Sequence, residues 1–63
     1  QQSYKLLLGK HGKSVSELYP TGQIEIEGLR YDARSSLGKI AKGENVEVFK
    51  VSEFELVVKP LES

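Results

Sequence analysis

Two runs of alternating apolar and polar residues flank the dipeptide Glu27-Gly28 and constrain this chain more than any other feature. A period of two places each set on its own face of a β-strand. The apolar members, which are expected to face a core, are Ile24, Ile26, Leu29, Tyr31 and Ala33. Because glycine readily adopts the positive φ that a two-residue primed turn requires, the dipeptide predicts a tight β-hairpin.

The same turn fixes the register of the hairpin. Counting outward from it places apolar residues opposite apolar ones and opposite charges face to face, in the pairs Ile26–Leu29, Glu25–Arg30 and Ile24–Tyr31. Each such cross-strand pair contributes about 0.2–1 kcal/mol relative to alanine. A slip by one residue would turn the apolar set to the solvent, so the register is strongly specified.

Further strands are predicted on both sides of the hairpin. Residues 13–18 form a strand that reaches the hairpin through Tyr19-Pro20-Thr21-Gly22, where the positions of proline and glycine fit a type I turn. Residues 46–51 and 54–59 are rich in β-branched and aromatic residues and are separated by Ser52-Glu53. Their expected core residues are Val46, Val48, Phe49, Leu56 and Val58.

Two local features indicate how these strands close. Between Val48 and Phe49 the alternation changes phase, which predicts a β-bulge or a strand that bends around a small barrel. Ile40, in the connection 39–43, is expected to plug one end of that barrel. Five short strands and no long helix predict an all-β chain that folds as a small closed five-stranded barrel.

The composition sets limits on stability and partners. With 63 residues there is room for one domain, and without cysteine neither a disulfide nor a thiolate zinc site can stabilise it. Nine basic residues balance nine acidic ones, so the basic excess typical of nucleic-acid-binding proteins is missing. No apolar run approaches the roughly 18–20 residues of a membrane-spanning helix. The apolar run Leu6-Leu7-Leu8 is a linker, a first strand or the end of an upstream segment.

The side chains with catalytic potential lack partners in the sequence. His11, the single histidine, has no neighbouring nucleophile or carboxylate pair and is expected to be an exposed loop residue. Glu25 and Glu27 share one strand face, but that face is the solvent side of the hairpin. The segment 9–13 lacks the spacing of a phosphate-binding loop. We therefore expect no enzymatic activity, no cofactor and no metal.

Binding of single-stranded nucleic acid is the main alternative from another functional class. Small five-stranded barrels bind such strands by stacking bases on aromatic side chains above a basic groove. The aromatic residues of this chain are scattered, and its basic residues alternate with acidic ones, as in Arg30, Asp32 and Arg34. The charge pattern therefore favours a protein partner, with a nucleic acid as the alternative.

An ordered series of motifs resembles the soluble C-terminal domain of the NfeD family. It runs from about Gly9 to Leu61 and consists of Gly9-x-x-Gly12, Leu18-Tyr19-Pro20-Thr21-Gly22, Ile24-x-Ile26-x-Gly28-x-Arg30-Tyr31-Asp32-Ala33, Ser35, Ile40-x-Lys42-Gly43-x-x-Val46-x-Val48 and Leu56-x-Val58-x-Pro60. The family usually has arginine before the turn proline, where this chain has Tyr19, and glycine in the last hairpin, where it has Glu53. The first difference weakens any role for a cation at that position.

The resemblance implies a five-stranded OB-fold that follows transmembrane helices in a bacterial or archaeal membrane protein. Longer family members also carry a Clp-like serine protease domain, which holds the catalytic serine and lysine, so no catalytic residue carries over to this chain. The implied partner is a stomatin- or flotillin-like protein, or further copies of the domain. The implied role is in membrane-protein quality control or membrane organisation.

The same resemblance suggests how the chain is divided. Residues 1–8 are expected to be a linker or the end of an upstream segment, residues 9–61 the OB-fold-like domain and residues 62–63 a tail. Membrane attachment would then lie in segments outside this chain, with the domain on the cytoplasmic rather than the external side.

Recognition is expected on the outer surface, because the side chains of the barrel fill its own interior. Loops carry function more often than the scaffold does. The partner-binding candidates therefore lie in the turn before the hairpin and in the connection after it: Tyr19, Pro20, Thr21, Arg34, Lys39 and Lys42. Tyr19 is the leading candidate, since a large amphipathic ring at a turn can anchor an interface at low entropic cost. The alternative is that this ring packs over the barrel end.

Overall fold

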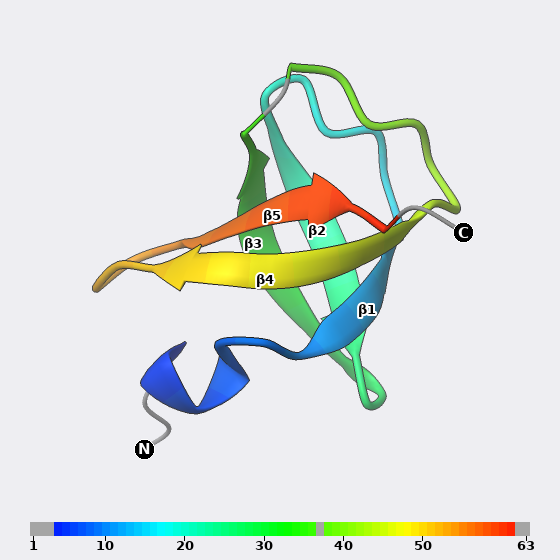
Figure 1. The fold of residues 1–63 in the computed structure, drawn as a ribbon. Helices are drawn as coiled ribbons and strands as arrows, with labels where there is room; N and C mark the ends of the chain where they lie inside the picture. Colours follow the sequence, from blue (N-terminus) through cyan, green and yellow to red (C-terminus); the bar gives the residue numbers. More distant parts are fainter. Residues whose placement is uncertain (1–3, 37, 62–63) are drawn as a thin grey trace.

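The computed structural model describes residues 4–36 and 38–61, which form one turn of 3-10 helix followed by five strands (Figure 1). The elements are η1 (Tyr4–Leu7), β1 (His11–Ser14), β2 (Thr21–Ile26), β3 (Leu29–Ser35), β4 (Asn45–Val51) and β5 (Leu56–Pro60). The strands close into a barrel in the order β1-β2-β3-β5-β4. The predicted all-β, five-stranded barrel is therefore confirmed.

The β2–β3 hairpin has the predicted turn and the predicted register. Its cross-strand pairs include Ile26–Leu29, Glu25–Arg30 and Ile24–Tyr31. Glu27 and Gly28 have φ angles of 53° and 86°, and positive φ at both central residues is the signature of a type I′ turn. This turn matches the right-handed twist of the two strands, so the long hairpin can curl into one wall of the barrel.

The barrel closes through pairs that are distant in sequence. β1 pairs with both β2 and β4, and β3 pairs in parallel with β5 from Ala33–Leu56 onward. Gly12 lies where β1 crosses β2, and a Cβ on it would meet the Glu25 carbonyl oxygen at 2.5 Å and Ile26 Cγ1 at 2.7 Å. Glycine at position 12 thus allows the close crossing of two backbones on which closure depends.

Apolar side chains fill the interior. The buried core comprises Leu18, Ile24, Ile26, Ala33, Ile40, Val46, Val48, Leu56 and Val58, with Leu7, Tyr31 and Val51 packed partly against it. The buried hydroxyl of Ser14 is satisfied, because it donates to the Ala41 carbonyl (2.7 Å) and accepts from the Glu44 amide (2.9 Å). Ile40 is 2% exposed, which confirms its prediction as a plug residue.

Two core predictions are wrong. Leu29 is 52% exposed, because β3 pairs with β5 only from Ala33 onward and the start of β3 extends past the closed part of the barrel. Phe49 is 42% exposed and lies at a register shift between Val48 and Lys50, so the predicted bulge is confirmed but turns this ring outward. The Lys59 ammonium lies 5.8 Å from the Phe49 ring centroid, a cation–π distance.

Several predicted boundaries also change. β1 ends at Ser14 instead of residue 18, and β5 begins at Leu56 instead of residue 54. The predicted type I turn at 19–22 is wrong, since residues 21 and 22 already pair with β3. The alternative of a first strand at 6–8 is also wrong, because residues 6 and 7 belong to η1, which packs against β4.

We predict that Ile26→Ala destabilises the domain by about 2–5 kcal/mol, because it leaves a cavity in a core with few side chains. The stability of so small a domain is about 5 kcal/mol, so this variant is expected to be partly unfolded at 25 °C. The measurement is urea denaturation followed by circular dichroism. Leu29→Ala, opposite Ile26 but exposed, is the matched control and should cost less than about 1 kcal/mol. Equal losses for the two variants would contradict the core assignment.

Candidate partner-binding surface

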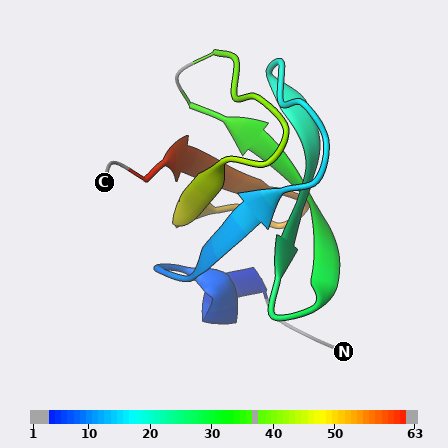
Figure 2. The ribbon, with the colours of Figure 1, turned by 90° about the vertical axis from the view of Figure 1, so that its right-hand side faces the viewer.

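The loops at one end of the barrel are held by a short backbone bridge. Leu18 and Ile40 exchange two hydrogen bonds of 2.9 and 2.8 Å, and both side chains are buried. Figure 2 shows the two connections, β1–β2 and β3–β4, running beside each other at the end opposite η1. Two chain segments without strand structure of their own are thus fixed against the core at one point.

Tyr19 follows this bridge directly and points away from the barrel. It is 73% exposed, although its neighbour Leu18 is completely buried. The ring therefore does not pack over the barrel end, and that alternative is wrong. Because Leu18 is anchored in the core, the backbone at Tyr19 is held in place. The Tyr19 ring itself stays exposed, so its surface is available to a partner, as a recognition residue requires.

Pro20 and Thr21 are held by the neighbouring strand. The Pro20 carbonyl accepts a hydrogen bond of 2.6 Å from the Ser35 amide, and Thr21 pairs with Arg34 across the β2–β3 ladder. The peptide bond between Tyr19 and Pro20 is cis. Three of the predicted residues thus form a continuous exposed segment on a supported backbone.

Two of the three predicted cationic side chains lie at this same end of the barrel. Lys39 Nζ lies 3.0 Å from Glu17 Oε2, which ties the two connections together a second time. Arg34 Nε lies 3.2 Å from Glu55 Oε2. Both pairs are at least partly exposed and therefore contribute little to stability, but they orient their side chains.

Lys42 lies apart from the others. It is exposed on the far part of the β3–β4 connection, where the Gly43 amide donates to the Ser14 carbonyl at 2.9 Å. The structure thus brings together five of the six predicted residues, which we call the loop face: Tyr19, Pro20, Thr21, Arg34 and Lys39.

A second exposed aromatic lies at the tip of the β4–β5 hairpin. Phe54 is 84% exposed, and the turn that carries it is closed by the Ser52 hydroxyl, which accepts from the Glu55 amide at 3.2 Å. An open groove beside it is lined by Thr21, Gly22, Gln23, Asp32, Ala33, Phe54 and Glu55. The sequence prediction placed Phe54 inside a strand, although the polar residues Ser52, Glu53 and Glu55 around it are a turn signal.

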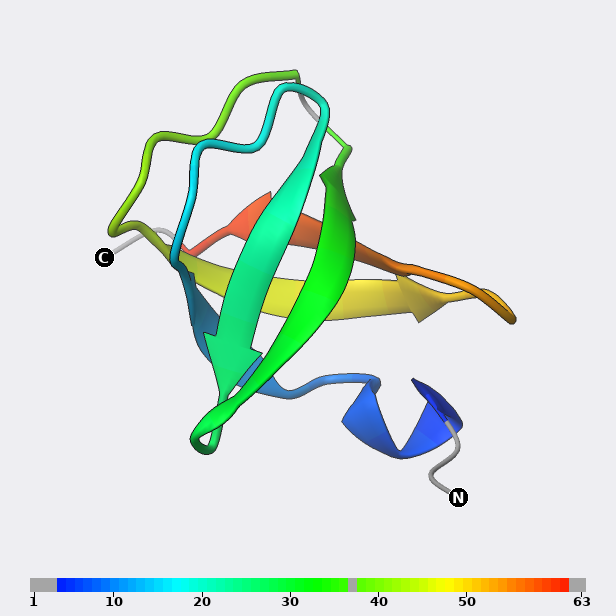
Figure 3. The same cartoon turned by 180° about the vertical axis from the view of Figure 1, so that it is seen from behind.

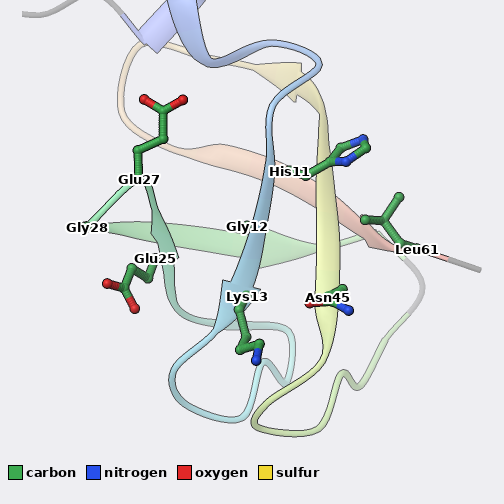
Figure 4. Close-up of a pocket in the computed structure, with 8 residues that line it drawn as sticks. All are labelled: His11, Gly12, Lys13, Glu25, Glu27, Gly28, Asn45 and Leu61. Atoms are coloured by element: carbon green, nitrogen blue, oxygen red, sulfur yellow. The ribbon is translucent and has the colours of Figure 1, made fainter.

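Another open depression lies over β1, and its side chains diverge. Figure 4 shows Glu25 and Glu27 on one side of β1 and His11 and Asn45 on the other. Among residues 4–36 and 38–61, no three His, Cys, Asp or Glu side chains are grouped to hold a metal ion. The depression offers no nucleophile–base arrangement of the kind that catalysis needs.

The outer faces of β2 and β3 are charged and contain no aromatic residue. Their outward residues are Thr21, Gln23, Glu25, Arg30, Asp32 and Arg34. In OB-folds these strands and the adjoining loops form the oligonucleotide-binding face, on which bases stack on aromatic rings. Here the face carries as many acidic as basic groups, and the groove at its edge includes the exposed ring of Phe54.

Comparison with known proteins assigns this fold to a family. The model of the NfeD-like C-terminal, partner-binding domain matches residues 4–60. The chain belongs to the NfeD family. This confirms the resemblance seen in the sequence, and the NfeD match begins at Tyr4, within η1.

Two solved structures share the fold of this NfeD domain. One is the C-terminal domain of stomatin operon partner protein 1510-C from Pyrococcus horikoshii, with a TM-score of 0.91, 34% identity and complete coverage of both chains. The other is the soluble domain of a membrane protein implicated in regulation of membrane protease activity from Corynebacterium glutamicum. Its TM-score is 0.82 at 25% identity, and the match covers 94% of this chain and 100% of that one.

A search of curated proteins gives no match. Within the described ranges, no helix has the length and apolar character needed to cross a membrane.

We predict that single-stranded DNA or RNA binds this domain with a Kd of about 10⁻⁴ M or weaker at physiological salt, the non-specific range. The reason is the balanced charge of the β2–β3 face and its lack of a stacking platform. Fluorescence anisotropy with labelled oligonucleotides of about 4–16 nucleotides, the site size of an OB-fold, measures it. Micromolar, salt-sensitive binding that is lost in Phe54→Ala would contradict the prediction and place bases on that ring.

Proposed function

We propose that this domain is a non-catalytic docking module that joins its membrane protein to a stomatin- or flotillin-like partner through the loop face. The observation that carries the proposal is the exposed Tyr19 ring, fixed one residue from the buried Leu18–Ile40 bridge. Rigid aromatic anchors of this kind dominate the binding energy of protein interfaces. Preorganisation lowers the entropic cost of association, because little backbone has to be ordered on binding.

The chemistry of the loop face fits a protein partner. Tyr19 and Pro20 supply a small apolar centre, while Arg34 and Lys39 lie at its rim in exposed ion pairs. Interfaces commonly have such an apolar centre with a polar rim, and arginine and tyrosine are enriched in them. Lys42, which lies farther along the same connection, would extend this rim.

The comparisons support the class of partner. The family description is of a partner-binding domain, and the structure from Pyrococcus horikoshii belongs to a stomatin operon partner protein. The structure from Corynebacterium glutamicum belongs to a membrane protein implicated in regulation of membrane protease activity. On this basis we propose a role in membrane-protein quality control or membrane organisation.

The proposal includes an arrangement along the chain and the membrane. Residues 9–61 would be the interaction module, residues 1–8 its link to an upstream segment and residues 62–63 a tail. Attachment to the membrane would come from segments outside this chain, with the module on the cytoplasmic side. Self-association through the loop face is the competing form of the same proposal.

We predict that Tyr19→Ala weakens binding to the stomatin-like partner by at least tenfold, the size of loss expected for a buried interface anchor. Its melting temperature should fall by less than about 4 °C, because an exposed ring contributes little to stability. Binding is measured by pull-down and titration of the membrane-anchored protein that carries this domain.

Phe54→Ala is the control, because it removes a similarly exposed ring that lies beside the loop face, at the tip of the β4–β5 hairpin, and is not part of it. It should leave binding unchanged. Loss of binding in Phe54→Ala with retention in Tyr19→Ala would contradict the loop face as the docking surface. A Tyr19-dependent change in the size of the isolated domain, without partner binding, would replace the partner by a second copy.

A further inference from the structure

The first part of β3 has an open edge. β2 pairs with one side of β3 from Leu29 to Arg34. On the other side β5 pairs with β3 only from Ala33 onward. Among the described residues, no strand pairs with β3 on this second side between 29 and 32. Figure 3 shows this part of the barrel from behind, with β2 and β3 side by side.

The backbone groups at this edge are identified by the alternation of the ladder. The Ser35 amide donates toward the β2 side, to Pro20, and the Ser36 amide donates toward β5, to Val58. Odd residues of β3 therefore direct their backbone groups to β2 and even residues direct them away from it. By this alternation the N–H and C=O of Arg30 and the N–H of Asp32 face the open side, before the first β3–β5 pair.

An apolar groove adjoins the inner face of this edge. It lies between η1 and the β2–β3 hairpin and is lined by Leu6, Leu7, Lys10, Ile26, Glu27, Leu29 and Tyr31. Leu6 is 73% exposed and Leu29 52%, so both offer contact area to a ligand. The two charged residues of the groove, Lys10 and Glu27, form an ion pair of 3.0 Å with each other. The other residues that line the groove are aliphatic or aromatic.

We infer that this edge and groove bind a short extended protein segment by β-strand addition. An extended backbone can hydrogen-bond to these three backbone groups in line, which gives affinity, while its alternate side chains enter the neighbouring groove. The segment must carry apolar residues on the side of Leu29 and Tyr31. On the outer side an acidic residue fits opposite Arg30 and a basic residue opposite Asp32.

A second copy of β3 does not fit this edge. In an antiparallel pairing of two such edges, the alternation allows the two-fold axis at residue 30 or at residue 31. An axis at 30 places Arg30 opposite the Arg30 of the other copy, a like-charge pair. An axis at 31 pairs Arg30 with Asp32 of the other copy, but it also places Leu29 of one copy opposite Ala33 of the other, where Leu56 of β5 already pairs. The occupant is therefore a segment of a different chain.

The test uses the 63-residue chain and a synthetic probe, acetyl-Lys-Val-Glu-Val-Thr-amide. In antiparallel addition its lysine faces Asp32, its glutamate faces Arg30 and its valines face the groove. Titration is followed in ¹⁵N-labelled protein by NMR. We expect a Kd of about 1 mM or tighter, with shifts at 29–32 and in Leu6 and Leu7. The Arg30 and Asp32 amides should become protected from hydrogen exchange.

Two modified peptides test the backbone contribution. N-methylation of the glutamate removes an amide that faces β3 and should weaken binding by at least about tenfold. N-methylation of the first valine, whose amide faces away from β3, is the matched control and should change binding less than threefold (about 0.65 kcal/mol). Equal effects of the two methyl groups would overturn strand addition.

Arg30→Pro tests the same edge from the protein side, because it removes an N–H that faces away from β2. It should abolish peptide binding, whereas Arg30→Lys keeps both the amide and the charge and should bind within about threefold. If Arg30→Pro does not fold, the two N-methylated peptides decide the question alone. Shifts confined to the loop face, or no shifts at 5 mM peptide (a Kd well above about 1 mM), overturn the inference. Protection of Arg30 that rises with protein concentration without peptide would also overturn it, in favour of a second copy.

Discussion

Among residues 4–36 and 38–61, the structure depends on the burial of nine apolar side chains, none larger than leucine or isoleucine, inside five short strands. A chain of 63 residues without cysteine has no disulfide to add to this burial. Two of the nine, Leu18 and Ile40, come from connections and not from the strands of the barrel. The core therefore fixes the positions of the loops as well as the strands, and this makes a recognition surface on loops possible in so small a domain.

The local part of this fold could be predicted from the sequence. The type I′ hairpin, its register and the inward positions of Ile24 and Ile26 follow from alternation and from one dipeptide. The bulge in β4 and the burial of Ile40 also left a signal, as a phase change and as a lone apolar residue in a polar connection. Each of these features is determined by residues close together in the chain.

The errors concern features that depend on long-range pairing. Alternation assigned Leu29 to the core, but the parallel β3–β5 pairing begins too late to cover it. The bulge was predicted, but its effect on Phe49 depends on which side of β4 faces the barrel. The open edge of β3 could not be predicted for the same reason, because it exists only where β5 is absent.

For the candidate surface, too, the sequence predicted local features but not long-range contacts. The sequence identified the residues of the loop face by their place in loops and by the large amphipathic ring of Tyr19, which can anchor an interface. It could not show that the Leu18–Ile40 bridge brings Lys39 beside Glu17, 22 positions earlier in the chain. Lys42, chosen by the same reasoning, lies apart because the connection continues toward β1.

The two ends of the barrel thus have different surfaces. The loop face presents a fixed aromatic among exposed ion pairs, while the opposite end presents a free strand edge beside an apolar groove. A module with both could hold a folded partner at one end and an extended segment at the other. The proposed function depends on the first of these surfaces, because the loop face is proposed to bind the stomatin-like partner.

Site-specific photo-crosslinking tests that claim most directly. A benzophenone side chain placed at Tyr19, in the membrane protein that carries this domain, is predicted to crosslink to the stomatin-like partner. The same group at Glu25, which is exposed on the outer face of β2, should not crosslink. Crosslinking from position 25 and not from position 19 would contradict the account.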